Sequence, residues 1–205
     1  MDHAEFERIL AAVDAALRAT FPDDYDARCM YATFGVRDLL RAAGLPAEIV
    51  AGDFVCFSVS KDGREALMEG FGAQAATTPS HFWVEAAGRR LDLGPHYLPR
   101  RSRLDAAVIP PLNWGLSAPL PHYLRYRERQ RWHPDVELAP GDPLAERVGL
   151  FRSILARVAS AAPGPSWPWV LHGPGAVTRA ARGGDPWALG ALRFLEVADR
   201  RTLPF

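Results

Sequence analysis

The sequence of 205 residues contains only two cysteines, Cys29 and Cys56. Two thiols cannot form the disulfide framework of a small secreted protein, and their spacing is not that of a metal site. No apolar run approaches the roughly 18 residues that a membrane span requires, and the N-terminal residues 1–8 are too acidic for a signal peptide. These absences predict a protein of a reducing, cytoplasmic compartment with no membrane partner.

Lysine is almost absent as well, because Lys61 is the only one and arginine supplies the rest of the basic charge. This bias is typical of a GC-rich bacterial genome. The formal net charge is +0 and no stretch of basic residues forms a stripe, so nucleic acid is not favoured as a partner. With 48% hydrophobic and 23% charged residues, the chain is predicted to form one globular domain over 1–205.

Two N-terminal segments have the periodicity of amphipathic helices. Residues 4–19 place apolar side chains at helical spacing, and a second helix is predicted over about 27–43. Asp26 or Asp24 is its expected N-cap. Cys29 therefore lies in the first turn of the second helix, on its apolar side.

Strand patterns follow these helices. Residues 49–59 are rich in β-branched and aromatic residues, and 61–64 form a candidate hairpin turn. The run 81–85 (His-Phe-Trp-Val-Glu) and a strand around 91–93 are predicted to form another hairpin, with its turn at Ala87-Gly88.

The register of this second hairpin decides which side chains share a face. With a two-residue loop, Asp92 pairs with Trp83 and lies diagonally beside His81. In an alternative register, in which the two strands are shifted by one residue pair, Asp92 lies directly opposite His81. In both registers the two side chains leave the same face, and the other face is wholly apolar. Any half-exposed hairpin also has one polar face, so the pattern alone does not decide between a site and a solvated surface.

A thiol, an imidazole and a carboxylate placed in this order can form a thiolate–imidazolium pair with an orienting acid. A free thiol has a pKa near 8.5 and is a useful nucleophile only as the thiolate. The positive end of a helix dipole favours that anion, and a nearby imidazole can take the proton. The amides of the first helical turn can also bind a developing oxyanion.

The run from Cys29 to Gly52, in which a helix ends in Gly-Leu-Pro-Ala and a strand follows, resembles the transglutaminase-like branch of the papain-like cysteine enzymes. The runs 81–85 and 91–92, with Gly88 between them, are similar to the histidine and aspartate strands of that superfamily. The resemblance covers about residues 26–95. It implies an α+β fold in which N-terminal helices pack on an antiparallel β-sheet.

The resemblance also implies roles for single residues: Cys29 as nucleophile, His81 as general base and Asp92 as orienting acid. The C-terminal half has no counterpart in the resemblance, so the substrate class does not follow from it. A peptide, a protein or a small amide is the expected substrate, and no cofactor or metal is expected. No clear glutamine or tryptophan lies just upstream of Cys29 to act as the second oxyanion donor. Substrate contacts are instead expected from Trp83, Tyr25 and Gln74.

The segment 94–143 is rich in proline and aromatic residues. Long irregular stretches within a compact domain are usually functional, so this segment is expected to cover the cleft of a catalytic core at about 20–95. Helices are expected in the C-terminal part (144–205), over 144–161 and 186–199. Four arginines of the covering segment alternate with period two and predict a solvated edge: Arg125, Arg127, Arg129 and Arg131.

Several alternatives remain open at this point. Asn113 could replace Asp92 as the third member, as in papain-type enzymes, and His81, Asp92 and His96 could instead share a metal. Cys56 is expected to be structural. The favoured function is a cysteine-nucleophile hydrolase acting on an amide or thioester carbonyl, as a peptidase, deamidase or acyl transferase. The alternative is a non-catalytic binding protein that keeps the papain-like fold.

Overall fold

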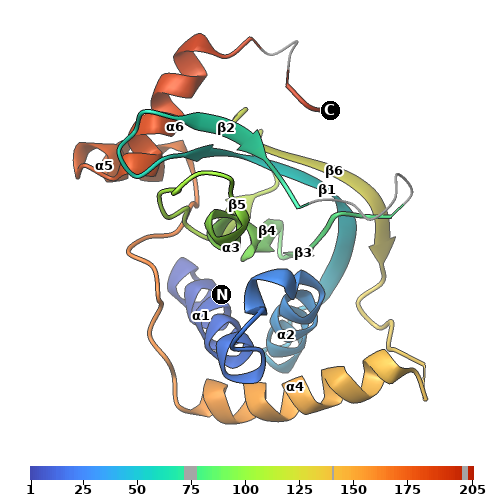
Figure 1. Ribbon diagram of the computed structural model, residues 1–205. Helices are drawn as coiled ribbons and strands as arrows, with labels where there is room; N and C mark the ends of the chain where they lie inside the picture. The colour runs from blue at the N-terminus through green and yellow to red at the C-terminus, as the bar shows by residue number, and fades with distance from the viewer. Residues whose placement is uncertain (72–77, 140, 200–202) are drawn as a thin grey trace.

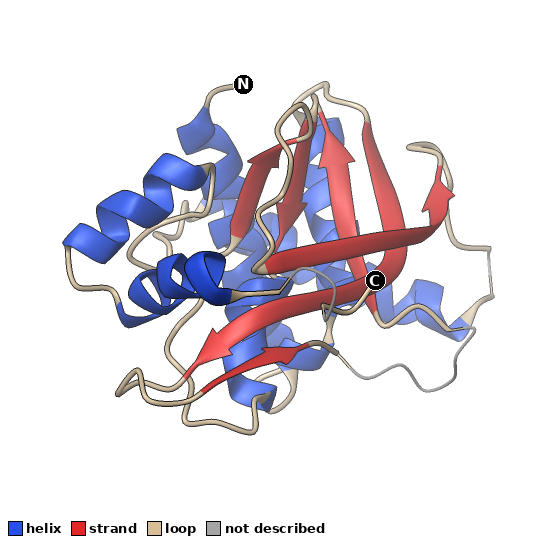
Figure 2. Cartoon of the chain, turned by 90° about the horizontal axis from the view of Figure 1, so that it is seen from above, coloured by secondary structure: helices blue, strands red, loops and turns tan. Residues whose placement is uncertain are grey.

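The computed structural model describes residues 1–71, 78–139, 141–199 and 203–205, which form an α+β fold with a curled antiparallel sheet (Figures 1 and 2). The helices are α1 (His3–Thr20), α2 (Cys29–Ala42), α3 (Gly94–Tyr97), α4 (Pro143–Ser160), α5 (Pro174–Arg182) and α6 (Pro186–Val197), with 3-10 turns η1 (Tyr25–Ala27) and η2 (Leu98–Arg101). The strands are β1 (Ala47–Val59), β2 (Ala66–Glu69), β3 (His81–Ala86), β4 (Arg89–Asp92), β5 (Leu112–Gly115) and β6 (Leu124–Trp132).

Strand β1, with 13 residues, is the longest of the described strands and pairs with β2, β3 and β6. The strand order is β2-β1-β3-β4-β5, and β6 also pairs with β1. The register between β1 and β6 shifts between Ala51 and Gly52, which marks a bulge. A side chain at position 52 would collide with the backbone carbonyl of Arg127 in β6 and with the ring of Trp83 in β3. Glycine at position 52 therefore allows three strands to approach closely.

Two hydrophobic cores lie along β1. The helical core contains side chains of α1, α2 and α4, which lie together in Figure 1, and packs them against the start of β1 and the apolar face of β3 and β4. The distal core packs α5 and α6 against the second half of β1, together with β5 and the start of β6. Strand β1 therefore passes from one core into the other.

The two N-terminal helices are confirmed, and α2 begins at Cys29 itself. The predicted N-cap is wrong, because the 3-10 turn η1 precedes the helix and Arg28 occupies the cap position without a side-chain cap. Asp26 is instead paired with Arg100 and Arg101 of η2, so a long-range ion pair replaces the local cap. Asp24 is paired with Arg28.

The expectation of an irregular covering segment over 94–143 is wrong. This part of the chain contributes β5 and the nine-residue strand β6 to the sheet, besides α3 and η2. The alternating arginines lie on β6, where Arg127 and Arg129 pair with Asp53 and Arg131 pairs with Glu85. The predicted helices near 144–161 and 186–199 are confirmed as α4 and α6. Within the described ranges, no helix is both long and apolar enough to span a membrane.

Candidate active site

The β3–β4 hairpin brings His81 and Asp92 together. Val84 pairs with Leu91 and Glu85 with Arg90, which is the register predicted for a two-residue turn. Nε2 of His81 and Oδ2 of Asp92 are 2.8 Å apart. Both residues are buried, with relative exposures of 0% and 4%. An ion pair withdrawn from water to this degree is screened little by solvent.

Two further donors fix the Asp92 carboxylate. The Tyr126 hydroxyl donates to Oδ2 at 2.6 Å, and the backbone N–H of Gly94 donates to Oδ1 at 2.7 Å. Burial, followed by the negative charge of Asp92, raises the pKa of Tyr126 well above its usual value, so its O–H remains a donor. Tyr126 is a site residue that the sequence analysis missed. A signal was present, because the arginines that alternate around Tyr126 indicate a strand with Tyr126 on its opposite face.

The His81 ring is held on several sides. The rings of Phe54 and Phe71 pack against it, with centroids 5.0 and 5.1 Å away. The chain also passes close to the ring at Gly94, where a Cβ atom would collide with Cε1 and Nε2 of His81. A glycine at position 94 thus allows its N–H to reach Asp92 while the imidazole lies directly beside the backbone.

The charge state of His81 follows from these contacts. Burial alone lowers its pKa, but the charge and the hydrogen bond of Asp92, together with smaller contributions from the Cys29 thiol, raise it from 6.5 to about 10. His81 is therefore an imidazolium at neutral pH. Because Nε2 faces Asp92, Nδ1 is the nitrogen left to act on a substrate or a nucleophile.

Cys29 is half-buried at the first position of α2. Its sulfur is near enough to His81 to raise the pKa of the imidazole, both as a hydrogen-bonding partner and as a charge. No hydrogen bond of ordinary length and angle joins Nδ1 of His81 to a partner among the described residues.

Two of the three expected substrate contacts, Trp83 and Tyr25, are buried, and the third lies outside the described residues. Trp83 is fully buried, its ring stacks on that of His81 with centroids 6.3 Å apart, and its indole N–H donates to Glu85, so it supports the imidazole. Tyr25 is also buried, and its hydroxyl accepts from Arg18. Gln74 lies in 72–77, outside the described residues.

The alternative site members are engaged in other contacts. Asn113 lies on β5, where its side-chain oxygen accepts from Arg89. Nδ1 of His96 is bonded to the carbonyl oxygen of Ile109. No group of three or more histidine, cysteine or acidic residues in the described part of the chain could hold a metal ion. Cys56 is fully buried, and burial raises the pKa of its thiol well above the usual value.

Comparison with known proteins yields little. No protein-family model matches the sequence, and no curated protein is significantly similar to it. A solved structure of a genomics target shares 19% sequence identity at a TM-score of 0.45, covering 79% of this chain and 78% of that one. The candidate site therefore rests on its own geometry.

Proposed function

We propose that the protein is a cysteine-nucleophile enzyme that acts on an amide or thioester carbonyl. The observation that carries this proposal is the buried His81–Asp92 pair, whose second nitrogen, Nδ1, has no hydrogen-bond partner among the described residues and is electrostatically linked to a thiol at the start of a helix. A purely structural His–Asp ion pair does not require a half-buried thiol beside the second ring nitrogen. A nucleophile gains a partner that favours its thiolate form.

The proposed reaction begins when the Cys29 thiolate attacks the carbonyl carbon. The backbone N–H groups of the first turn of α2 lack partners within the helix and can bind the resulting oxyanion. Nδ1 of His81 gives its proton to the leaving amine or thiolate as the C–N or C–S bond breaks. Nδ1 then takes a proton from water, or from an acceptor amine, as this nucleophile attacks the acyl-thioester and releases Cys29. Hydrolysis is the simpler outcome, because it needs no second substrate.

We also propose that the protein belongs to the transglutaminase-like branch of the papain-like enzymes and acts in the cytoplasm. Membership of this branch is supported by the order of the elements: a cysteine that begins a helix, then a strand with the histidine and a strand with the aspartate, both in an antiparallel sheet. The cytoplasmic location is supported by the two cysteines, which are both unpaired and thus suit a reducing compartment.

The test is alkylation of the native protein by iodoacetamide between pH 5 and 9, with mass spectrometry to locate the label. We expect Cys29 to be labelled rapidly even at pH 6, where ordinary thiols are almost fully protonated. Cys29→Ala should abolish labelling, and the matched variant Cys56→Ala should leave it unchanged, since Cys56 is fully buried. A Cys29 that reacts only after denaturation would refute the proposed activity.

A further inference from the structure

A cavity of about 210 Å³ is lined by side chains of α2, β1, β3, β6, the segment that follows β6 and the start of α4. All of its lining side chains are apolar except Arg37 and Glu137. Protein interiors are close-packed and seldom leave a space of this size empty. A dry cavity of about 150 Å³ is enough to bind benzene, so this cavity has room for an aromatic ring or a branched alkyl group.

The cavity lies apart from the candidate active site. Phe82, which lines it, directly follows His81 on β3, so the two side chains leave opposite faces of the strand. Arg37 lies eight residues after Cys29 in α2, which corresponds to about 12 Å along the helix. The rings of Phe82 and Trp132 are stacked with an interplanar angle of 13°, and they give the cavity a flat aromatic wall.

Arg37 is the unusual member of the lining, because it is only 1% exposed. A buried charge is costly unless an opposite charge and hydrogen bonds compensate it. Nη1 of Arg37 donates at 2.5 Å to a neutral group, the carbonyl oxygen of Val136. Nη2 contacts the carboxylates of Asp38 and Glu137 only at 3.3 and 3.4 Å, and Nε has no partner among the described residues. The Nε–Nη2 edge, which can bind a carboxylate through two parallel hydrogen bonds, is therefore poorly occupied.

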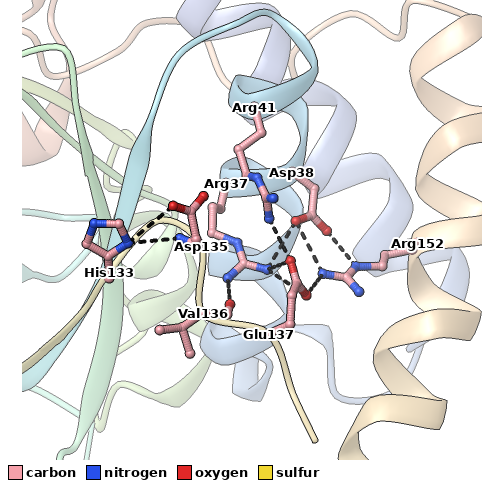
Figure 3. Close-up of polar contacts among 8 residues, drawn as sticks. All are labelled: Arg37, Asp38, Arg41, His133, Asp135, Val136, Glu137 and Arg152. Carbon is pink, nitrogen blue, oxygen red and sulfur yellow. Dashed lines mark hydrogen bonds and ion pairs between the residues drawn. The ribbon is translucent and has the colours of Figure 1, made fainter. Parts of the chain in front are cut away.

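Figure 3 shows the ionic cluster around this side chain, which consists of Arg37, Asp38, Arg41, Glu137 and Arg152. Glu137 is bound by Arg41 and Asp38 by Arg152, each at 2.6 Å. Three arginines thus share two carboxylates, which leaves one positive charge in excess. Asp135, drawn beside the cluster, is largely exposed, so water screens its charge. The excess charge borders the cavity, because Arg37 and Glu137 both line it.

We propose that this cavity binds a small carboxylic acid whose carbon skeleton is an aromatic ring or a branched alkyl group. The carboxylate binds the Nε–Nη2 edge of Arg37 and supplies the missing negative charge. The carbon skeleton lies against Phe82 and Trp132. Asp38 and Glu137 keep their other arginine partners, so neither is left unpaired when the ligand binds.

Entry of the ligand requires a local movement. Nε of Arg37 is buried in the empty cavity, so the segment that carries Val136 and Glu137 must shift to admit the carboxylate. This segment has no regular secondary structure. The inference goes beyond the proposed function and does not depend on it, because Cys29 does not line the cavity.

The test is isothermal titration calorimetry of the native protein at pH 7 with phenylacetate, phenylacetamide and acetate. Phenylacetate has both the ring and the charge, and each of the other two lacks one of them. We expect one phenylacetate per chain, bound at least about tenfold more tightly than either of the others. Arg37→Met should reduce the affinity for phenylacetate at least about tenfold. The matched control Arg157→Met, which changes an exposed arginine of α4, should leave it unchanged.

The other outcomes overturn the inference. Equal affinities for phenylacetate and phenylacetamide would mean that the cavity does not select a charge, and equal affinities for phenylacetate and acetate would mean that it does not select a ring. Absence of binding at millimolar concentration, or binding that is lost in Cys29→Ala, would also refute it. Should Arg37→Met not fold, Leu138→Trp, which fills the cavity, replaces it. Unchanged phenylacetate binding in that variant would contradict the proposal.

Discussion

Replacing Asp92 by asparagine tests the whole electrostatic argument. Asp92 accepts three hydrogen bonds, from the His81 ring, the Tyr126 hydroxyl and the Gly94 amide. An asparagine side chain offers one oxygen and one NH₂ group, so in either orientation a donor faces a donor. The variant also removes the negative charge that opposes the desolvation of the imidazole.

The size of the effect follows from the pKa of His81. Its rise from 6.5 to about 10 corresponds to about 5 kcal/mol in favour of the imidazolium. Without Asp92, burial dominates and the pKa of His81 falls below 6.5, so the ring is neutral at pH 7. The thiol then lacks a cationic partner, and its thiolate form is no longer favoured at pH 6.

The assay is the ratio of iodoacetamide labelling rates at pH 8.5 and pH 6, which cancels differences in intrinsic nucleophilicity. An ordinary thiol gives a ratio of about 150, which we expect for Asp92→Asn, whereas the wild-type ratio should stay within a few-fold of one. The matched control is Asp53→Asn, which removes another ion-paired carboxylate of the sheet and should keep the wild-type ratio. Unlabelled Cys56 shows that each variant is folded. Equal ratios for Asp92→Asn and the wild type would refute the reasoning.

Three further predictions concern the same site. Tyr126→Phe removes a hydrogen bond to a charged, buried carboxylate, so urea denaturation should show a loss of about 1.5–3 kcal/mol in the free energy of unfolding; a loss below 0.5 kcal/mol would contradict the contact. Gly94→Ala forces a methyl group into the His81 ring and should slow Cys29 labelling at pH 6 by about tenfold or more. The control Gly149→Ala, in α4 with open space around it, should leave labelling unchanged and stabilise the protein by about 0.5–1 kcal/mol. Finally, the folded protein holds a proton on His81 up to about pH 10, whereas the unfolded chain loses it near pH 6.5. This contribution to stability is therefore complete below about pH 6.5 and is lost as the pH rises towards 10. The free energy of unfolding should fall over this range in the wild type and less so in Asp92→Asn.

Local patterns predicted the parts of the site that depend on neighbours in sequence. The placement of Cys29 in the first turn of α2 follows from helical periodicity, although the predicted start at about residue 27 is two residues early. The pairing across the β3–β4 turn follows from the loop length. The glycine after α2, Gly44, has a positive φ of 78°, as expected for a helix C-terminus. These features require no knowledge of distant contacts.

The missed features depend on distant contacts. Strand β6 lies between proline-rich segments and pairs with residues about 75 positions earlier, so its local sequence resembles an irregular loop. Because β6 covers the polar face of the hairpin, Trp83 is buried against Tyr126 and does not face a cleft. Asp26 lost its predicted capping role for a similar reason, since its arginine partners lie 74 and 75 residues later.

Gly52 links the geometry of the proposed site to a residue that has no side chain. It pairs with His81 on one side, and on the other it lies against the strand that carries Tyr126. Any side chain at position 52 would push these two strands apart and lengthen the contact between the phenol and the carboxylate. Mutational scans of activity should therefore identify this position as intolerant, although it has no side chain that could do chemistry.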